Sequence, residues 1–207
     1  MTRVKICGIR RVDDAVAAVG AGADMLGFVF APSRRRIDPE AARDIVVEAR
    51  HHGSARMVGV FVDEPAAEIE RIAQACELDY VQLSGDEPDA VLRALSYPTI
   101  KALHVSAATT PEELVARADA IAADMLLLDT AAQGLRGGSG VPFDWSVIPR
   151  LDRPVLLAGG LHAGNVREAI DRAHPWGVDV SSGVETGGEK DPYRIHEFVR
   201  RVHRSAG

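Results

Sequence analysis

Cysteine, positive charge and long apolar runs are all scarce in this chain. The two cysteines, Cys7 and Cys76, are too few for a disulfide framework and lack the spacing of metal ligands. A formal net charge of −6 argues against nucleic acid or an anionic membrane as the main partner. No apolar run is long enough to cross a membrane, and the first residues lack the apolar segment of a secretory signal. We therefore expect a reduced, cytoplasmic enzyme.

What the chain does have is a regular alternation of two patterns over its 207 residues. Short apolar runs, typical of buried strands, alternate with segments whose apolar residues recur at helical spacing. The predicted strands cover residues 4–8, 25–30, 57–62, 80–83, 100–105, 125–128, 155–158 and 178–180. This alternation predicts an α/β fold with helices covering a parallel sheet. Because no linker or low-complexity segment divides the chain, we expect a single domain over residues 1–207, a (β/α)8 TIM barrel.

An open, Rossmann-like sheet is the alternative architecture. Eight consecutive units close a barrel more naturally than they extend an open sheet, and no Gly-x-Gly-x-x-Gly motif follows the first predicted strand. Helix starts are marked where an N-cap residue precedes proline, at Asp38, Thr110 and Asp191. A short helix is also expected near Trp145.

The last two predicted strands end in small residues that suit an anion. Residues 155–158 are followed by Gly159 and Gly160, and residues 178–180 by Ser181, Ser182 and Gly183. Glycine allows close approach to the backbone, and N–H dipoles favour negative charge. In a (β/α)8 barrel the loops after strands 7 and 8 are a frequent phosphate site. We therefore expect the backbone of these two loops to bind a phosphate.

Two other strand ends carry groups suited to acid–base chemistry, because active sites of such barrels lie at the C-terminal ends of the strands. Cys7 ends the first predicted strand and is either a small buried residue or, as a thiolate, a general base. Asp129 follows four apolar residues at the end of the sixth strand. It either caps a turn or, with its pKa raised by desolvation, serves as a general acid.

Lys5 and Asp179 are expected near Cys7 inside the barrel. Lys5 precedes Cys7 by two residues, so both side chains point to the same face of the strand. Since strand 8 neighbours strand 1 in a closed barrel, Asp179 can face the same interior. We hypothesise that the charge of Lys5 favours the Cys7 thiolate. Asp179 is either a structural partner of Lys5 or a ligand for sugar hydroxyls.

Three consecutive arginines, Arg34, Arg35 and Arg36, follow the second predicted strand. Each alone is typical of a solvated loop, but three at the mouth of an acidic protein indicate that at least one contacts an anionic substrate group. Arginine offers a bidentate fork for such a group. Because the phosphate is assigned to the far side of the mouth, we expect a carboxylate here. The Gly-rich segment 133–140 is either a flexible connection or a lid over the substrate.

Together these groups predict a specific kind of chemistry. A thiolate base, a carboxylic acid and two anion sites favour isomerisation of a sugar phosphate through proton transfer. The sequence contains no cluster with metal-ligand spacing and no nucleotide-binding fingerprint. We therefore expect a small phosphorylated molecule as the partner, and neither cofactor nor metal.

Ordered motifs cover almost the whole chain. They are Lys5-Ile6-Cys7-Gly8-Ile9, Gly27-Phe28-Val29-Phe30, Val81-Gln82-Leu83 with Gly85-Asp86-Glu87, Leu127-Leu128-Asp129-Thr130, Gly137-Gly138-Ser139-Gly140 with Phe143-Asp144-Trp145, Ala158-Gly159-Gly160-Leu161 with Asn165-Val166, and Asp179-Val180-Ser181-Ser182-Gly183-Val184-Glu185 with Lys190-Asp191. In these motifs the chain resembles the phosphoribosylanthranilate isomerase family. The resemblance implies an isomerase of tryptophan biosynthesis that performs the Amadori rearrangement of N-(5-phosphoribosyl)anthranilate to 1-(2-carboxyphenylamino)-1-deoxyribulose 5-phosphate.

The resemblance also implies a role for each site residue. Cys7 would take the C2 proton of the ribose, and Asp129 would protonate the ring oxygen and open the furanose. Arg35, in a Ser-x-Arg motif, would bind the anthranilate carboxylate. The phosphate would be held by backbone at Gly159, Gly160, Ser182 and Gly183. One departure is Ser84, where the family commonly has His, so we expect weaker substrate binding than with His.

Other functions are open at this point. A histidine-pathway aminoaldose isomerase would use a pair of Asp residues, one of them in place of Cys7, and indole-glycerol-phosphate synthase would need a Lys acid from a longer chain. A barrel that binds a phosphorylated metabolite without catalysis is a third alternative, and the intact pair of Cys7 and Asp129 argues against it. We expect a monomer, because no apolar stripe is left over on the outer helices.

Overall fold

The chain folds into a closed barrel of parallel strands. The computed structural model describes residues 1–106, 108–129 and 145–203. The strands are β1 (Arg3–Cys7), β2 (Met25–Val29), β3 (Arg56–Phe61), β4 (Tyr80–Leu83), β5 (Thr99–His104), β6 (Met125–Asp129), β7 (Val155–Ala158) and β8 (Gly177–Val180). Because β8 pairs with β1 and every strand pairs with the next, the predicted (β/α)8 TIM barrel is confirmed and the open-sheet alternative is wrong.

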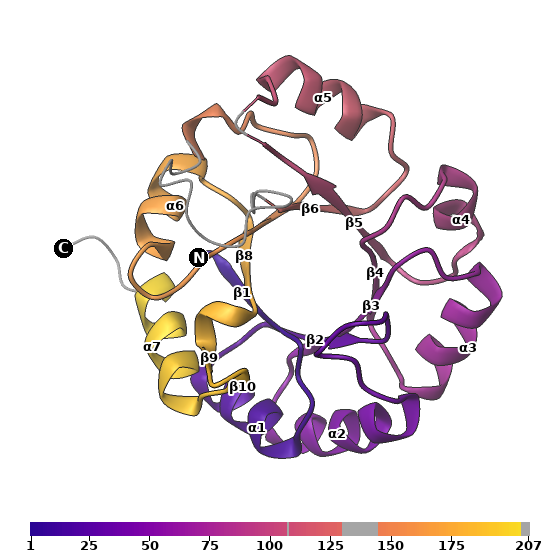
Figure 1. Ribbon diagram of the computed structural model, residues 1–207, viewed down its shortest axis with the longest axis vertical. Helices are drawn as coiled ribbons and strands as arrows, with labels where there is room; N and C mark the ends of the chain where they lie inside the picture. The colour runs from indigo at the N-terminus through magenta and orange to yellow at the C-terminus, as the bar shows by residue number, and fades with distance from the viewer. Residues whose placement is uncertain (107, 130–144, 204–207) are drawn as a thin grey trace.

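Helices surround the barrel on the outside (Figure 1). They are α1 (Val12–Ala21), α2 (Pro39–His52), α3 (Ala66–Ala75), α4 (Asp89–Ala94), α5 (Pro111–Asp119), α6 (Val166–Ala173) and α7 (Pro192–His203). The element expected near Trp145 is a single 3₁₀ turn, η1 (Trp145–Val147). In the described ranges, no helix is both long and apolar enough to cross a membrane.

The three predicted helix starts are confirmed, since α2, α5 and α7 each begin at the proline of the motif. The Thr110 hydroxyl accepts a hydrogen bond of 3.2 Å from the Glu113 N–H, as an N-cap should. The Asp191 carboxylate accepts one of 2.9 Å from the Tyr193 N–H. Asp38 forms no such bond with its side chain, so proline alone marks the start of α2.

Side chains alternate between two apolar regions because successive residues of a strand face opposite sides. One region lies between the barrel and the helices. The other fills the barrel interior with Met25, Val58, Ile100, Ala102, Met125, Leu127, Leu156 and Ala158. Toward the C-terminal ends of the strands, the polar side chains facing the interior include Gln82, His104, Asp129 and Asp179. These positions form the mouth of the barrel.

An element that the sequence did not predict follows β8. A 3₁₀ turn, η2 (Ser182–Val184), leads into a small antiparallel hairpin of β9 (Glu185–Thr186) and β10 (Glu189–Lys190). In Figure 1 this hairpin lies between the end of β8 and the neighbouring helices α1 and α7. It places charged residues beside the barrel mouth.

Candidate functional site

A pocket of about 350 Å³ opens at the C-terminal end of the barrel. It is lined by Arg35, Gln82, Ser84, Ala102, His104, Leu127, Asp129, Ala158, Gly159, Gly160, Leu161, Asp179, Val180, Ser181 and Ser182. These residues come from the ends of β4 to β8 and from the loop after β2. The structure therefore gathers most of the predicted site residues into one cavity.

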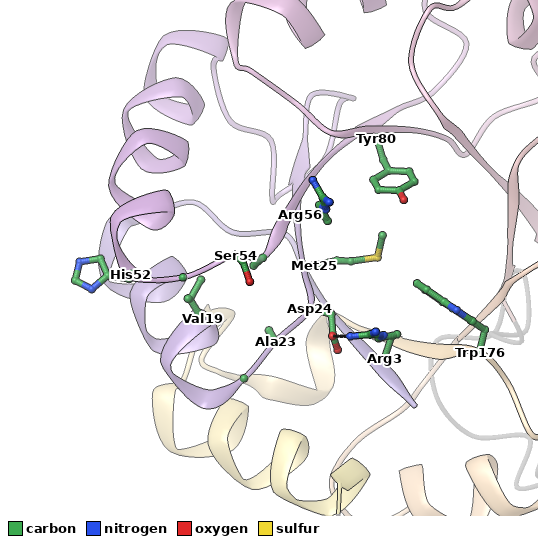
Figure 2. A pocket seen from close by; sticks show the side chains of 13 residues that line it. Arg3, Val19, Ala23, Asp24, Met25, His52, Ser54, Arg56, Tyr80 and Trp176 are labelled. Carbon is green, nitrogen blue, oxygen red and sulfur yellow. Dashed lines mark hydrogen bonds and ion pairs between the residues drawn. The ribbon is translucent and has the colours of Figure 1, made fainter. Parts of the chain in front are cut away.

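A larger pocket, of about 570 Å³, lies at the opposite end of the barrel (Figure 2). Its walls include the first residues of β1, β2 and β3 and the side chains of Tyr80 and Trp176. Its charged groups are paired, as Arg3 with Asp24 at 2.6 Å. We assign the chemistry to the smaller pocket because barrel enzymes react at the C-terminal face, where the predicted acid and the anion-binding loops lie.

Cys7 lies at the end of β1, just below the mouth pocket, and its side chain is almost completely buried. Lys5, on the same face of β1, is fully buried and forms an ion pair with Asp179 across the β1–β8 register, with Nζ 2.7 Å from Oδ1. Asp179 also lines the pocket. Both sequence interpretations of Asp179, as partner of Lys5 and as a residue facing the substrate, therefore fit its position.

The electrostatics of Cys7 agree in direction with the hypothesis that the charge of Lys5 favours the thiolate. Burial raises the pKa of the Cys7 thiol; the charge of Lys5 lowers the pKa but does not compensate. The negative charge of Asp179 raises the Cys7 pKa further, because it repels the thiolate. Lys5 thus acts in the expected direction, and the opposing effect of burial is the larger one.

Gly27 of β2 leaves space for the side chains of Cys7 and Lys5. A Cβ atom at Gly27 would lie 2.9 Å from the Cys7 sulfur and 3.1 Å from the Lys5 ammonium nitrogen. The first contact would force a neighbour to move, and the second is tighter than almost all real Cβ contacts. The glycine of the second-strand motif is therefore explained by close packing against the thiol and the lysine.

Asp129 is the last residue of β6, and one third of its side chain is exposed to the pocket. It pairs in register with His104 of β5, whose Nδ1 lies 3.9 Å from an Asp129 carboxylate oxygen. The Asp129 carboxyl is more open than its apolar strand suggested, because the strand buries only the residues before it. His104 also lines the pocket, although the sequence did not show which way its side chain points.

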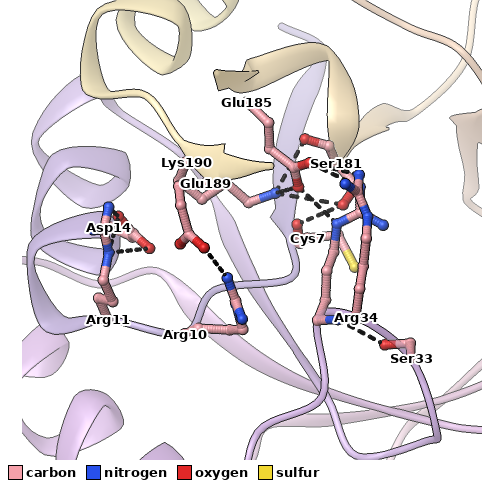
Figure 3. A network of polar contacts seen from close by, with 11 residues as sticks. Cys7, Arg10, Arg11, Asp14, Ser33, Arg34, Ser181, Glu185, Glu189 and Lys190 are labelled. Carbon is pink, nitrogen blue, oxygen red and sulfur yellow. Dashed lines mark hydrogen bonds and ion pairs between the residues drawn. The ribbon is translucent and has the colours of Figure 1, made fainter. Parts of the chain in front are cut away.

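Arg35 is the arginine of the triplet that lines the pocket, whereas Arg34 and Arg36 are exposed. Its Nε and Nη2 donate hydrogen bonds of 2.6 and 3.0 Å to the two carboxylate oxygens of Glu185. Glu185 is surrounded by basic side chains at the β9–β10 hairpin (Figure 3). Arginine chemistry alone could not choose among the three, and only the family resemblance pointed to Arg35; in the structure this distant carboxylate holds the Arg35 side chain at the pocket.

The loops after β7 and β8 lie side by side at the pocket, where the sequence predicts an anion site. Gly159 and Gly160 have φ angles of 92° and 63°, a left-handed backbone that favours glycine. They line the pocket together with Ser181 and Ser182. Gly183 lies behind them, where a Cβ atom would come within 1.9 Å of the Leu161 carbonyl oxygen. Gly183 therefore lets the two loops pack directly against each other.

The fourth strand adds two further groups to the pocket wall. The Gln82 side-chain amide donates a 3.0 Å hydrogen bond to the Ser84 hydroxyl, while the buried Gln82 Oε1 has no partner among the described residues. Lys101 faces the other side of β5, where it pairs with Glu87 beneath the loop after β4.

The predicted lid at residues 133–140 lies outside the described residues.

Comparisons with known proteins agree with this geometry. A family model described as N-(5'phosphoribosyl)anthranilate (PRA) isomerase matches residues 4–201. The chain is 49% identical over 202 residues to the N-(5'-phosphoribosyl)anthranilate isomerase of Desulforudis audaxviator, with 97% of both chains covered. It is 42% identical to the crystal structure of phosphoribosyl anthranilate isomerase from Thermotoga maritima, with a TM-score of 0.86 and coverage of 97% of this chain and 98% of that one.

A second solved structure is a phosphoribosyl anthranilate isomerase in complex with reduced 1-(o-carboxyphenylamino)-1-deoxyribulose 5-phosphate. The chain is 39% identical to it, with a TM-score of 0.81 and coverage of 97% of this chain and 98% of that one. Sequence and fold thus agree over nearly the whole length. The chain belongs to the N-(5'-phosphoribosyl)anthranilate isomerase family.

Proposed function

We propose that Cys7 and Asp129 carry out the family's reaction in the pocket at the barrel mouth. As a member of this family, the protein is an isomerase of tryptophan biosynthesis that converts N-(5-phosphoribosyl)anthranilate into 1-(2-carboxyphenylamino)-1-deoxyribulose 5-phosphate. Backbone at Gly159, Gly160, Ser182 and Gly183 holds the phosphate, Arg35 holds the anthranilate carboxylate, and Asp179 faces the sugar hydroxyls. The complex of a relative with the reduced product supports this use of the pocket.

The proposed mechanism gives one proton-transfer step to each of the two catalytic groups. Asp129 donates a proton to the furanose ring oxygen, the bond between this oxygen and C1 breaks, and the anthranilate nitrogen stabilises the resulting cation as an iminium. The Cys7 thiolate then removes the C2 proton to form an enolamine, which becomes the aminoketose as C1 gains a proton and the C2 hydroxyl loses one. Binding both ends of the substrate holds its reacting carbons at the acid and the base. The comparisons do not favour the three alternative functions considered for the sequence.

The observation that carries this proposal is the meeting of an acid, two anion sites and a buried thiol at one end of the barrel. The test is turnover of N-(5-phosphoribosyl)anthranilate by the purified chain, followed as loss of anthranilate fluorescence. Asp129→Asn removes the proton donor but keeps the shape, so we expect kcat to fall by about 10²–10⁴-fold. Affinity for the product should change by less than about threefold, and near-full turnover in this variant would remove Asp129 from the mechanism.

Ser84 provides a second test of the pocket. A histidine at this position would reach farther into the cavity than the serine hydroxyl, which is held by Gln82. We expect Ser84→His to lower KM about fivefold, as one added hydrogen bond would, and to leave kcat within about twofold. Steady-state kinetics measure both constants. If neither constant changes, position 84 makes no contribution to binding.

We further propose that the protein is a cytoplasmic monomer formed by one domain over residues 1–207 and works without cofactor or metal. Both cysteines are free and buried, which suits a reducing compartment. The exposed large apolar side chains of the described residues belong to separate elements rather than to one stripe, which favours a monomer. Neither step of the rearrangement exchanges electrons with a second molecule, so the reaction needs no redox cofactor. Its partner is the small phosphorylated substrate alone.

A further inference from the structure

Arg35 uses only one side of its guanidinium group for Glu185. The side-on pair engages Nε and Nη2, at 2.6 and 3.0 Å from the two carboxylate oxygens. This pair leaves Nη1 and the second Nη2 hydrogen for another anion. The aliphatic part of Arg35 lies against Gly8, where a Cβ atom would come within 2.4 Å of its Cδ. The arginine is therefore held in one orientation from two sides.

Glu185 is a buried carboxylate with several cationic partners. Its side chain is 5% exposed, and Lys190 Nζ lies 2.8 Å from one carboxylate oxygen. Arg34 reaches the other oxygen from the exposed side, also at 2.8 Å. Burial alone would raise the pKa of Glu185, but hydrogen bonds from Arg35 and Lys190, together with their charges, lower it to about 2. Glu185 is thus negative under all ordinary conditions.

The charges of this cluster do not cancel. Three cations, Arg34, Arg35 and Lys190, surround the single carboxylate, which leaves a formal charge of +2 beside the pocket. A cluster with this excess favours a second anion rather than excluding it. Because Glu185 is already bound to the cations, it orients Arg35 without neutralising the cluster.

The β9–β10 hairpin connects this cluster to the rest of the site. Lys190 lies directly opposite Glu185 in the hairpin register. The Lys190 ammonium also donates a 3.0 Å hydrogen bond to the Ser181 carbonyl, and the Ser181 hydroxyl donates one of 3.0 Å to the Cys7 carbonyl. One chain of contacts therefore runs from Arg35 through the hairpin to the loop after β8 and to the end of β1.

We propose that Glu185 is a positioning residue for substrate selection, which fixes the free side of Arg35 toward the carboxylate on the aromatic ring of the substrate. The inference rests on the proposed function and deepens it, since it names the group that gives Arg35 its orientation. The β9–β10 hairpin then serves to place the Glu185 carboxylate beside Arg35. Substrates that lack the ring carboxylate gain nothing from Glu185.

The test compares two ligands that differ only in this carboxylate. Calorimetry measures the affinity of reduced 1-(2-carboxyphenylamino)-1-deoxyribulose 5-phosphate and of its phenylamino counterpart. We expect Glu185→Gln to reduce the preference for the carboxylated ligand about tenfold, because the neutral amide holds the guanidinium less firmly. Glu189→Gln is the matched control, since Glu189 lies in the same hairpin but pairs with Arg10. Its preference should equal that of the wild type.

The outcomes separate the inference from the proposed function. An equal loss of both ligands, an unchanged preference or tighter binding of the carboxylated ligand in Glu185→Gln would overturn the inference. Should Glu185→Gln fail to fold, Glu185→Asp keeps the charge but shortens the side chain, and it should reduce the same preference. A wild-type protein that neither binds the carboxylated ligand nor turns over the substrate would instead overturn the proposed function.

Discussion

Cys7→Ser is expected to lower kcat for N-(5-phosphoribosyl)anthranilate by about 10²–10⁴-fold. The serine hydroxyl fits the space of the thiol beside Gly27 but is far too weak an acid to supply an oxyanion base. Both anion sites remain intact, so affinity for the product should stay within about twofold. Stopped-flow fluorescence with saturating substrate measures the chemical step directly.

Cys76→Ser is the matched control for this variant. Cys76 is also buried, but it is the C-cap residue after α3 and donates a 3.2 Å hydrogen bond to the Pro39 carbonyl, which a serine can replace. Its turnover should equal that of the wild type. Near-normal kcat in Cys7→Ser would show that another group removes the C2 proton.

The ionisation of the Cys7 thiol can be measured without turnover. Because burial raises the pKa of Cys7, its alkylation by iodoacetamide should increase with pH beyond the range of a free thiol. Lys5 lowers this pKa, so Lys5→Met should move the alkylation profile to still higher pH. For a thiol that is mostly protonated, a profile displaced by one pH unit means about tenfold less thiolate at neutral pH. A profile that does not move would reject any influence of Lys5 on Cys7.

The two-residue period of strands was enough to predict which side chains meet inside the barrel beside Cys7. The parity of β1 placed Lys5 and Cys7 on one face, and the closed register then brought Asp179 opposite Lys5. For β5 the same reasoning gives no answer, because Lys101 and His104 face opposite sides of the strand and the sequence does not say which of them faces inward. In the structure Ile100 and Ala102 fill the barrel interior, so His104 faces inward and Lys101 faces outward.

The hairpin after β8 shows what periodicity cannot detect. Its strands have two residues each, too few for any alternation, and its left-handed turn of Gly187 and Gly188 is typical of many loops. No periodic pattern therefore marks Glu185 and Lys190 as buried. Their burial comes from the ion pairs that they form with each other and with Arg35, which lies 150 residues away from Glu185 in sequence.

Gly183→Ala is expected to raise KM for the phosphorylated substrate about 100-fold, the largest effect on binding of any variant considered. The new Cβ atom would lie 1.9 Å from the Leu161 carbonyl oxygen and 3.1 Å from the His162 Cα, both backbone atoms. Backbone cannot turn away as a side chain can, so the loops after β7 and β8 must separate. Their N–H groups then no longer converge on one phosphate, and two lost hydrogen bonds to a charged group account for this magnitude.

Gly187→Ala separates this effect from the general cost of replacing glycine. Gly187 also has a left-handed backbone, with φ of 62°, but a Cβ atom there meets nothing within 4 Å. It should therefore cost only about 1–2 kcal/mol of stability and leave KM unchanged. Inorganic phosphate, used as a competitive inhibitor, should bind more weakly to Gly183→Ala and normally to Gly187→Ala. If phosphate binds equally to both, the anion site does not depend on the contact between the two loops, and the phosphate must be held elsewhere.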